Sequence, residues 1–434
     1  MPGVSVTIES LAHGGDGVGR LPDGRAVFVP LSCPGDEAEI EVTEDHGRWA
    51  RGTITRLVRP SDARVEPPCP YFGTCGGCSW QHVDYEQQLR AKHRNLTDLL
   101  TRIGRLENPP VGEPDASGPP YGYRNRIELT VRPAVRGVTV GFLRAGSDEL
   151  LPIDACPLLP AQHQRLPKAL AGALSFLAPR GADSVVRVTV RVASSGEIAV
   201  VLWTPAGPFP RHIAATVLAQ ATGARNIARL VIRGTPERRD VSAVETLAGP
   251  GVWREVLGGD RYTVSPPAFF QVNSAAAARL REIAVDLLGA DGTMRVADLY
   301  AGVGTFTLPI ARVAGETLAV EMSRFALSDL RRNLADARLD ADIVPGDAAY
   351  ALPDVGHVDA ALIDPPRSGL SDKAMRALTG ARIGRLVYVS CDPATLARDV
   401  KLLVGSGYEP QRFVPVDLYP QTYHLETVAL LQRR

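Results

Sequence analysis

A cysteine and a glutamate near the carboxyl end of the chain have residue types suited to nucleophilic and base chemistry. Cys391 follows a short apolar run and precedes Asp392-Pro393, so it stands where a strand gives way to a helix. A helix N-terminus lowers the pKa of a thiol, which predicts a nucleophilic thiolate at this position. Glu426, in the run His424-Leu425-Glu426, begins the last apolar strand and is the candidate base.

This pair of groups suits alkylation of a pyrimidine ring carbon. The C5 carbon is not nucleophilic enough alone, and thiolate attack at C6 makes it enolate-like. After the alkyl group is transferred, a base must remove the C5 proton so that the thiol can leave. Cys391 and Glu426 could divide these two tasks, whereas the alternatives are a structural cysteine and a solvated carboxylate.

A glycine-containing loop upstream has the pattern of an adenosyl-cofactor site. Residues 298–306 read Asp-Leu-Tyr-Ala-Gly-Val-Gly-Thr-Phe, follow an apolar run and open a helical pattern. Glycines in such a loop let the backbone approach a ligand closely. Thr307 stands where a dinucleotide fingerprint has its third glycine, which disfavours NAD. Glu321 ends the next strand, where a carboxylate can accept the two ribose hydroxyls of a nucleoside.

A rigid loop follows a third strand at the same predicted sheet edge. It reads Asp364-Pro365-Pro366-Arg367, and ligands of open α/β sheets bind at the carboxyl ends of strands. Enzymes that methylate amino groups tend to place an aromatic residue after such a Pro-Pro pair. Arg367 stands there instead, so the loop departs from that class.

Four cysteines have the spacing of a metal site. Cys69, Cys75 and Cys78 form a C-x5-C-x2-C run, and Cys156 is available further along the chain. Four thiolates can hold zinc or an iron–sulfur cluster, and the spacing alone does not choose between them. Cys33 stands outside this set and is expected to be inert.

Three segments of different pattern must position these residues. Residues 1–60 alternate short strands with Gly- and Pro-containing turns, which is typical of a small β-barrel. Residues 61–255 hold the cysteines, a helical pattern, a proline-rich linker at 109–120 and alternating strands that we expect to be antiparallel.

The third segment, residues 256–434, alternates short apolar runs with helical stretches. This alternation predicts a parallel, doubly wound sheet. Two late strands, 411–418 and 426–432, have no helix between them and should form an antiparallel pair at the sheet edge. A mostly parallel sheet with one late reversed strand is the plan of class I methyltransferases.

Composition excludes several classes of protein. Hydrophobic residues are 45% and charged residues 22% of the chain, an ordinary globular balance. No run approaches the roughly 18 apolar residues of a membrane span, and residues 1–4 lack the features of a signal peptide. Six cysteines are too few for a secreted disulfide scaffold. We therefore expect a cytoplasmic protein with no membrane partner.

The net charge is zero, but its distribution is uneven. Residues 61–255 carry a net charge of +5, whereas residues 1–60 carry −3 and residues 256–434 carry −2. A local positive excess can hold an anionic polymer even when the whole chain is neutral.

Together these motifs resemble the RNA uracil-5-methyltransferase family, most closely its 23S rRNA branch, over nearly the whole chain. Residues 1–60 are similar to its TRAM domain, and further matching segments are 123–126, 269–273, 390–393 and 424–426. The resemblance implies an α/β fold. A class I, Rossmann-like S-adenosylmethionine-dependent domain would follow a small OB-like barrel and a mixed α+β central domain.

The resemblance also implies a role for each matching residue. Cys391 would attack C6 of the uracil and Glu426 would take the C5 proton. Glu321 would hold the ribose of S-adenosylmethionine, Asp347 would approach its adenine and Asp364 its methionine end. The implied cofactor-binding set is Gln271, Tyr300, Gly302, Gly304, Thr305, Glu321, Asp347 and Asp364. The implied ligands of a [4Fe-4S] cluster are Cys69, Cys75, Cys78 and Cys156.

The partner implied is RNA, and the protein is expected to be a monomer. The tRNA-specific branch of the family lacks the TRAM domain and the cysteine cluster, so their presence favours ribosomal RNA. Alternatives are a tRNA uracil-5 or RNA cytosine-5 methyltransferase, or a non-catalytic RNA-binding iron–sulfur protein. A cytosine-5 enzyme would not predict the cysteine run, and intact Gly302, Gly304 and Asp364 argue against loss of catalysis.

Overall fold

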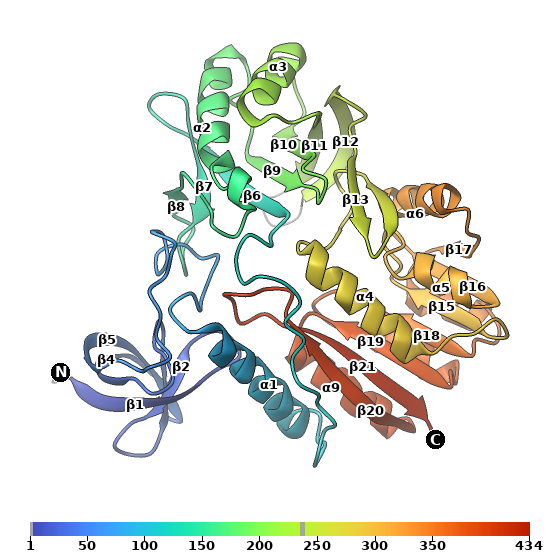
Figure 1. Ribbon diagram of the computed structural model, residues 1–434, viewed down its shortest axis with the longest axis horizontal. Helices are drawn as coiled ribbons and strands as arrows, with labels where there is room; N and C mark the ends of the chain where they lie inside the picture. The colour runs from blue at the N-terminus through green and yellow to red at the C-terminus, as the bar shows by residue number, and fades with distance from the viewer. Residues whose placement is uncertain (1–2, 235–238) are drawn as a thin grey trace.

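The computed structural model describes residues 3–234 and 239–434, and its strands form four sheets. In Figure 1 a closed barrel lies at lower left, a seven-stranded central sheet at the top and a second seven-stranded sheet at lower right. A two-stranded hairpin connects the two larger sheets along the chain. No helix in the described part of the chain has the length and apolar character needed to span a membrane.

The amino-terminal barrel has short strands with buried apolar residues at alternate positions. Its strands are β1 (Val4–Leu11), β2 (Gly17–Arg20), β3 (Ala26–Val29), β4 (Glu37–Asp45) and β5 (Trp49–Arg59). They close in the order β1-β2-β3-β5-β4. The prediction of a small barrel is therefore confirmed.

Helix α1 (Tyr85–Arg102) and the proline-rich segment fasten the middle of the chain to the C-terminal sheet. Asp84 caps the helix by accepting a hydrogen bond from the amide of Gln87 at 2.9 Å. The helix packs against α9 (Pro393–Gly405). The linker pairs with β20 (Tyr408–Val416) through Gly112, whose amide donates to the carbonyl of Phe413 at 2.8 Å. The linker therefore covers a strand that would otherwise be an open edge.

The central sheet has the order β12-β11-β10-β9-β6-β7-β8. Its strands are β6 (Arg126–Pro133), β7 (Val138–Leu143), β8 (Leu150–Pro152), β9 (Arg187–Val192), β10 (Ile198–Pro205), β11 (Asn226–Gly234) and β12 (Arg239–Ala248). Helices α2 (Leu166–Leu177) and α3 (Arg211–Thr222) and short 3-10 turns at Ala161–His163 and Ala178–Arg180 accompany it. The predicted antiparallel pairing is confirmed for β6, β9 and β10, but β10 also pairs in parallel with β11, a strand that was not predicted. Helix α3 carries the chain back between them, as a parallel connection requires.

The hairpin β13 (Trp253–Leu257) and β14 (Asp260–Val264) leads into helix α4 (Ser274–Leu288). A domain boundary between residues 255 and 256 would fall inside β13. The hairpin packs on the C-terminal half through Trp253, Tyr262 and Phe270, which share one buried cluster with residues of the second large sheet.

The C-terminal sheet has the order β17-β16-β15-β18-β19-β21-β20. Its remaining elements are β15 (Arg295–Leu299), α5 (Thr307–Val313), β16 (Glu316–Glu321), α6 (Arg324–Ala337), β17 (Asp342–Pro345), α7 (Ala348–Ala351), a 3-10 turn (Leu352–Asp354), β18 (Ala360–Ile363), α8 (Asp372–Gly380), β19 (Arg385–Ser390) and β21 (Glu426–Arg433). β15 to β19 pair in parallel, whereas β21 is antiparallel to β19 and β20. The predicted doubly wound sheet and its antiparallel edge pair are confirmed.

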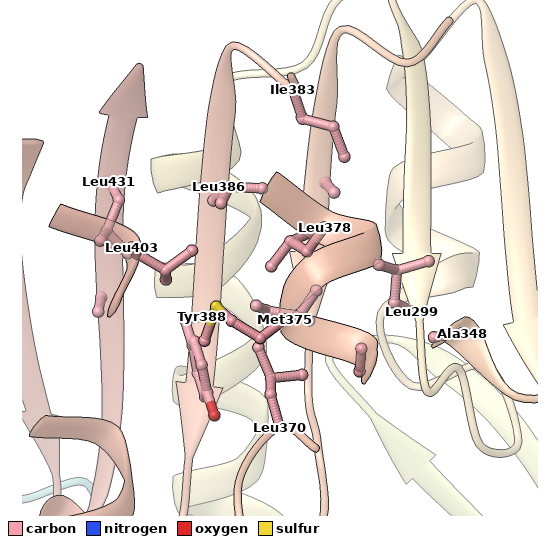
Figure 2. Packing of buried hydrophobic residues seen from close by; sticks show 14 of the residues in the cluster. Leu299, Ala348, Leu370, Met375, Leu378, Ile383, Leu386, Tyr388, Leu403 and Leu431 are labelled. Atoms are coloured by element: carbon pink, nitrogen blue, oxygen red, sulfur yellow. The ribbon is translucent and has the colours of Figure 1, made fainter. Parts of the chain in front are cut away.

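Buried apolar side chains fix the strands that carry the site. Figure 2 shows Leu386 and Tyr388 of β19 packed with Met375 and Leu378 of α8. A second cluster covers the other face of the sheet with residues of α4 and α5. Because both faces are covered, only the strand ends are left to present polar groups.

Candidate active site at the carboxyl edge of the C-terminal sheet

The antiparallel pair β19–β21 brings Cys391 and Glu426 together. Ser390 is the last residue of β19 and pairs with Thr427 of β21, so Cys391 and Glu426 occupy the next position of the same register. Residues opposite each other in such a pair lie on one face, with Cβ atoms about 4.5–5.5 Å apart. Asp392 then caps α9 by accepting hydrogen bonds from the amides of Ala394 and Thr395, both at 3.0 Å.

Two buried carboxyl groups, Glu426 and Asp298, and the half-buried carboxyl of Asp364 lie at this edge. Glu426 is 3% exposed, and burial followed by the charge of Asp364 raises the pKa of its carboxyl to about 8. Burial and the neighbouring Asp298 raise the pKa of Asp364 to about 7. Burial also raises the pKa of Asp298 to about 7, although Thr307 donates a hydrogen bond to it at 2.5 Å. Clustered buried carboxyl groups favour a cation among them, since a positive charge offsets their mutual repulsion.

The expectation of a lowered thiol pKa at Cys391 is wrong. Burial raises its pKa to about 12, and the nearby carboxyl groups of Glu426 and Asp364 add to the rise. The guanidinium of Arg367 acts in the opposite direction but does not offset burial. The sequence showed the helix N-terminus but could not show which carboxylates the fold would gather around the thiol.

The loop after β15 is shaped by backbone conformations that favour glycine. Gly302 and Gly304 have φ values of 57° and 95°, and Tyr300 has a φ of 68°. Glu321 at the end of β16 accepts a hydrogen bond from the amide of Gly302 at 2.8 Å. The carboxylate predicted to hold a ribose therefore stands directly beside the glycine loop and also shapes it.

The remaining predicted cofactor residues surround the same edge. Gln271 is 5% exposed, and its Oε1 atom has no hydrogen-bond partner among the described residues. The carbonyl of Thr305 accepts a hydrogen bond from Tyr262 at 3.3 Å. Asp347 caps α7 by accepting from the amide of Ala349 at 2.9 Å. A buried, unpaired acceptor together with a glycine loop and a cluster of carboxyl groups fits a ligand that is both a nucleoside and a cation.

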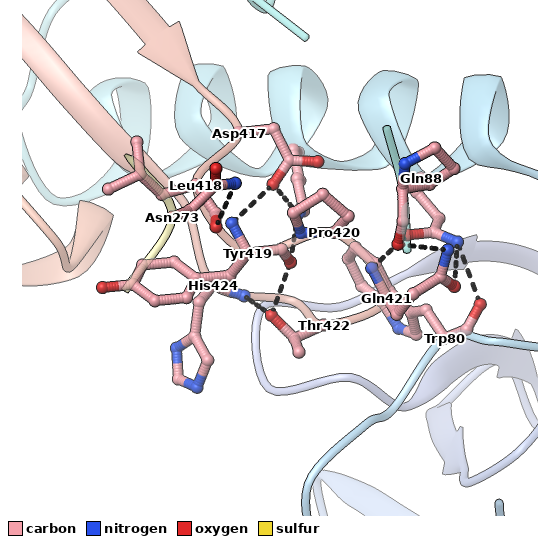
Figure 3. A network of polar contacts seen from close by, with 12 residues as sticks. Trp80, Gln88, Asn273, Asp417, Leu418, Tyr419, Pro420, Gln421, Thr422 and His424 are labelled. Atoms are coloured by element: carbon pink, nitrogen blue, oxygen red, sulfur yellow. Dashed lines mark hydrogen bonds and ion pairs between the residues drawn. The ribbon is translucent and has the colours of Figure 1, made fainter. Parts of the chain in front are cut away.

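The loop between β20 and β21 is held from outside the C-terminal sheet (Figure 3). Gln421, which has a φ of 70°, accepts hydrogen bonds at its carbonyl from the amides of Ser79 and Trp80, both at 3.0 Å. Its side chain accepts from Nε2 of Gln88 at 3.0 Å, and its amide donates to Oε1 of Gln88 at 2.9 Å. The loop that leads to Glu426 is thus fixed by the segment that follows the cysteines.

A buried ion pair supports the start of the same loop. Nζ of Lys92 lies 2.7 Å from Oδ1 of Asp417, and both side chains are fully buried. Lys92 also donates to the carbonyl of Tyr419 at 3.1 Å. Removing one member of a buried pair leaves an uncompensated charge, which is strongly destabilising.

The barrel also reaches the candidate active site, which the sequence did not indicate. Nε2 of His13, in the turn between β1 and β2, lies 3.9 Å from Oδ2 of Asp392 beside Cys391. Nε1 of Trp80 donates to the carbonyl of Gly15 in the same turn at 2.8 Å. No local pattern in residues 12–16 signals these contacts, because they depend on how the barrel docks.

The four predicted metal ligands line one cavity. Cys69, Cys75, Cys78 and Cys156 surround a space of about 170 Å³. The turn is anchored by the amide of Gly76, which donates to the carbonyl of Leu143 at 3.1 Å. In the described residues, no three His, Cys, Asp or Glu side chains are arranged as ligands of a single metal ion. Cys33 is fully buried elsewhere, in a cluster with Leu11 and Trp80.

Comparison with known proteins matches a segment at each end of the chain to a known family. The TRAM domain family matches residues 4–55, and the tRNA (Uracil-5-)-methyltransferase family matches residues 354–434. An uncharacterized RNA methyltransferase of Gloeobacter violaceus is 34% identical, covering 99% of this chain and 96% of that protein. One of Halalkalibacterium halodurans is 32% identical, again covering 99% of this chain and 96% of that protein.

A solved structure has the same overall arrangement. The Pyrococcus abyssi tRNA (uracil-54, C5)-methyltransferase, crystallised with S-adenosyl-L-homocysteine, superposes with a TM-score of 0.77 at 27% identity and covers 99% of both chains. The fold and its edge site therefore define an S-adenosylmethionine-dependent RNA methyltransferase with an amino-terminal TRAM domain. The chain belongs to the RNA uracil-5-methyltransferase family.

Proposed function

We propose that this enzyme transfers a methyl group to C5 of a uridine in 23S ribosomal RNA through a covalent adduct with Cys391. The observation that carries the proposal is the register of β19 and β21, which sets Cys391 opposite Glu426. A nucleophile and a base on one face of a strand pair can act on adjacent carbons of the same ring.

The cofactor site is proposed from the residues that surround the glycine loop. S-adenosylmethionine, when bound, supplies an electrophilic methyl group on a positively charged sulfur. Glu321 would accept the ribose hydroxyls, while Tyr300, Gly302, Gly304 and Thr305 would contact the nucleoside through the loop. Gln271 would accept a hydrogen bond from the cofactor at its unpaired Oε1 atom, and Asp347 would approach the adenine. Asp364 would face the cation, because a positive charge would stabilise the anion of a carboxyl whose pKa is raised by burial and by Asp298.

The chemistry of the chain's own residues then follows in order. Sγ of Cys391 gives its proton to solvent water and bonds to C6 of the uracil, so the electrons of the C5–C6 double bond become available at C5. C5 takes the methyl group, and Glu426 as carboxylate removes the proton left on C5. The C5–C6 double bond re-forms as the sulfur–C6 bond breaks. A pKa of about 8 suits Glu426 as a base near neutral pH.

The cysteine-lined cavity is proposed to hold a [4Fe-4S] cluster. A single ion requires its ligands to converge on one point, whereas each cysteine of a [4Fe-4S] cluster bonds a different iron. The cavity of about 170 Å³ between the four thiols is suited to such a larger body. Because Ser79 and Trp80, directly after Cys78, hold the loop between β20 and β21 through Gln421, the cluster would have a structural role rather than a redox role.

The substrate could instead be transfer RNA, and one observation favours this second candidate. The Pyrococcus abyssi enzyme is a tRNA (uracil-54, C5)-methyltransferase, and its match covers 99% of this chain, including the barrel. The match spans both the barrel and the cysteine segment, so neither separates the two substrates, and only the combined motifs favour ribosomal RNA. Residues 1–60 would bind RNA, residues 61–255 would hold the cluster and residues 256–434 would carry catalysis.

The deciding experiment maps 5-methyluridine in RNA from cells with and without this protein. Loss of one or more 5-methyluridines from 23S rRNA, restored by the wild-type gene, is the expected result. Loss from tRNA alone would select the second candidate. Loss of 5-methylcytidine, or of no modified nucleoside, would contradict uracil methylation.

A further inference from the structure

A cavity beside the candidate active site is formed where four distant segments meet. It has a volume of about 340 Å³, within the range of about 300–1,000 Å³ typical of small-ligand pockets. Its walls come from the barrel turn around Gly15, the cysteine segment around Ser79, the turn at Ala145 between β7 and β8, and the loop 422–424.

The segments approach one another closely at this cavity. A Cβ atom on Gly15, which has a φ of 105°, would lie 3.1 Å from Cβ of Ser79 and 3.2 Å from Cδ1 of Tyr423. The hydrogen bonds of Gln421 to Ser79 and Trp80 hold two of these walls together. The cavity is thus built by tertiary contacts that are present without any ligand.

One wall is shared with the reacting groups. The rings of Tyr423 and His424 pack at a tilt of 40° with centroids 4.3 Å apart, and the ring of His13 packs edge-on against Tyr423 at 5.7 Å. His424 stands two residues before Glu426, and His13 approaches Asp392 beside Cys391. An RNA chain whose target base lies at Cys391 would therefore have a neighbouring nucleotide within reach of this wall.

The cavity presents the groups that recognise a nucleobase. Aromatic and imidazole rings offer stacking surfaces for unstacked bases. Burial lowers the pKa of His424 to about 4, so its ring is neutral near pH 7 and does not repel or ion-pair with its neighbours. Oγ of Ser79 is buried and has no hydrogen-bond partner among the described residues, so it is free to bond a base edge.

We propose that this cavity binds the unpaired nucleotide that flanks the target uridine in the RNA. The inference rests on the proposed function, because it takes the target base to lie at Cys391. It assigns the barrel, the cysteine segment and the β7–β8 turn a shared task of selecting which uridine enters the site. Ser79 is the proposed specificity residue, and the rings of Tyr423 and His424 supply the stacking surface.

The test uses the full-length enzyme and an RNA hairpin that carries the mapped uridine as 5-fluorouridine. Derivatives of the hairpin have an abasic residue on the 5′ or the 3′ side of the target. Ala145→Trp fills the mouth of the cavity, and Ala134→Trp, in the exposed turn between β6 and β7, is the matched control. RNA affinity is measured by fluorescence anisotropy, adduct formation on a denaturing gel, and S-adenosylmethionine affinity by calorimetry.

Ala145→Trp should weaken binding of the intact hairpin about tenfold, as loss of one base–aromatic stack does. One of the two abasic hairpins should bind wild-type enzyme about tenfold more weakly and should not lose further affinity with Ala145→Trp. S-adenosylmethionine affinity should be unchanged, and Ala134→Trp should behave as wild type. Ser79→Ala should weaken binding of the intact hairpin about threefold and should leave binding of the same abasic hairpin unchanged.

Several outcomes would overturn the proposal. They are equal affinity of Ala145→Trp and wild type, multiplicative effects of the variant and the abasic residue, or an equal loss with Ala134→Trp. If Ala145→Trp does not fold, Ser79→Ala serves as the test. The proposal is then overturned if Ser79→Ala weakens binding of both abasic hairpins by the same factor as binding of the intact hairpin. If the wild-type enzyme forms an adduct but neither abasic residue changes its RNA affinity, only this inference is refuted. If no RNA forms an adduct, the proposed function is refuted, and so is the assignment of a flanking nucleotide to the cavity.

Discussion

The edge of the C-terminal sheet and the cysteine-lined cavity both gather residues that are far apart in the sequence, but they do so by different means. At the sheet edge, hydrogen-bonded strands set the positions of Cys391, Glu426 and Asp364. At the cavity, Cys75 and Cys156 stand on turns that are held by a few separate hydrogen bonds. The sheet therefore positions its residues by backbone pairing, whereas the cavity would depend on the cluster that we propose it holds.

The reacting pair offers the largest expected effect. Cys391→Ala should abolish methylation and any covalent adduct while cofactor binding remains, since the nucleophile is lost but the strand ends are not. Glu426→Gln should still form the adduct but release it roughly 10²–10⁴-fold more slowly, because elimination needs the base. A methylated RNA–protein adduct should then accumulate on a denaturing gel. Methylation by Cys391→Ala, or normal turnover by Glu426→Gln, would contradict the mechanism.

The cysteines provide the matching test on the other side of the comparison. Anaerobically purified protein should be brown, with about four iron and four sulfide per chain. Cys69→Ser, Cys75→Ser, Cys78→Ser and Cys156→Ser should each lose the colour, and protease sensitivity should rise in the cysteine segment but not in the C-terminal sheet. Cys33→Ser is the control, because Cys33 is buried away from the cavity. Stoichiometric zinc without iron would refute the cluster.

The buried carboxyl groups predict how activity depends on pH. The base is the ionised form of Glu426, and its pKa of about 8 leaves roughly a tenth of it ionised at pH 7. The rate constant for resolving the covalent adduct, in which the thiol has already reacted, should therefore rise with pH between about 6.5 and 8.5, approaching tenfold per unit at the lower end. A profile that is flat over this range in the wild type would show that burial does not set the pKa of the base.

The smallest effect should come from the contact that links the two regions. Gln88→Leu removes both hydrogen bonds to Gln421 and leaves the buried polar groups of Gln421 unpaired. This should lower the free energy of unfolding by about 1–3 kcal/mol. Thermal unfolding should shift down, and adduct resolution should slow more than adduct formation because Glu426 follows this loop. Arg229→Met, at a buried hydrogen-bonded arginine of the central sheet, is the control. It should lower stability without changing the ratio of the rates of adduct resolution and adduct formation.

Sequence patterns were sufficient where periodicity and residue type have one structural solution. The barrel, the doubly wound sheet and the reversed edge strand were all predicted, because alternation and short apolar runs reflect burial. The parallel pairing of β10 and β11 was missed, since alternation does not encode strand direction. The direction of the shift in the thiol pKa of Cys391 was also mispredicted, because it depends first on burial and then on carboxyl groups contributed by other strands.

The sequence by itself determined which groups could react, since Cys391, Glu426, the glycine loop and the four cysteines are visible as types at recognisable spacings. Only the tertiary structure decided that His13 of the barrel approaches Asp392 and that Gln421 is bonded to the cysteine segment. The physical reason is that these contacts join segments whose local patterns are complete without each other. They arise from how the barrel and α1 dock on the sheet, and no single segment of the sequence is sufficient to predict that docking.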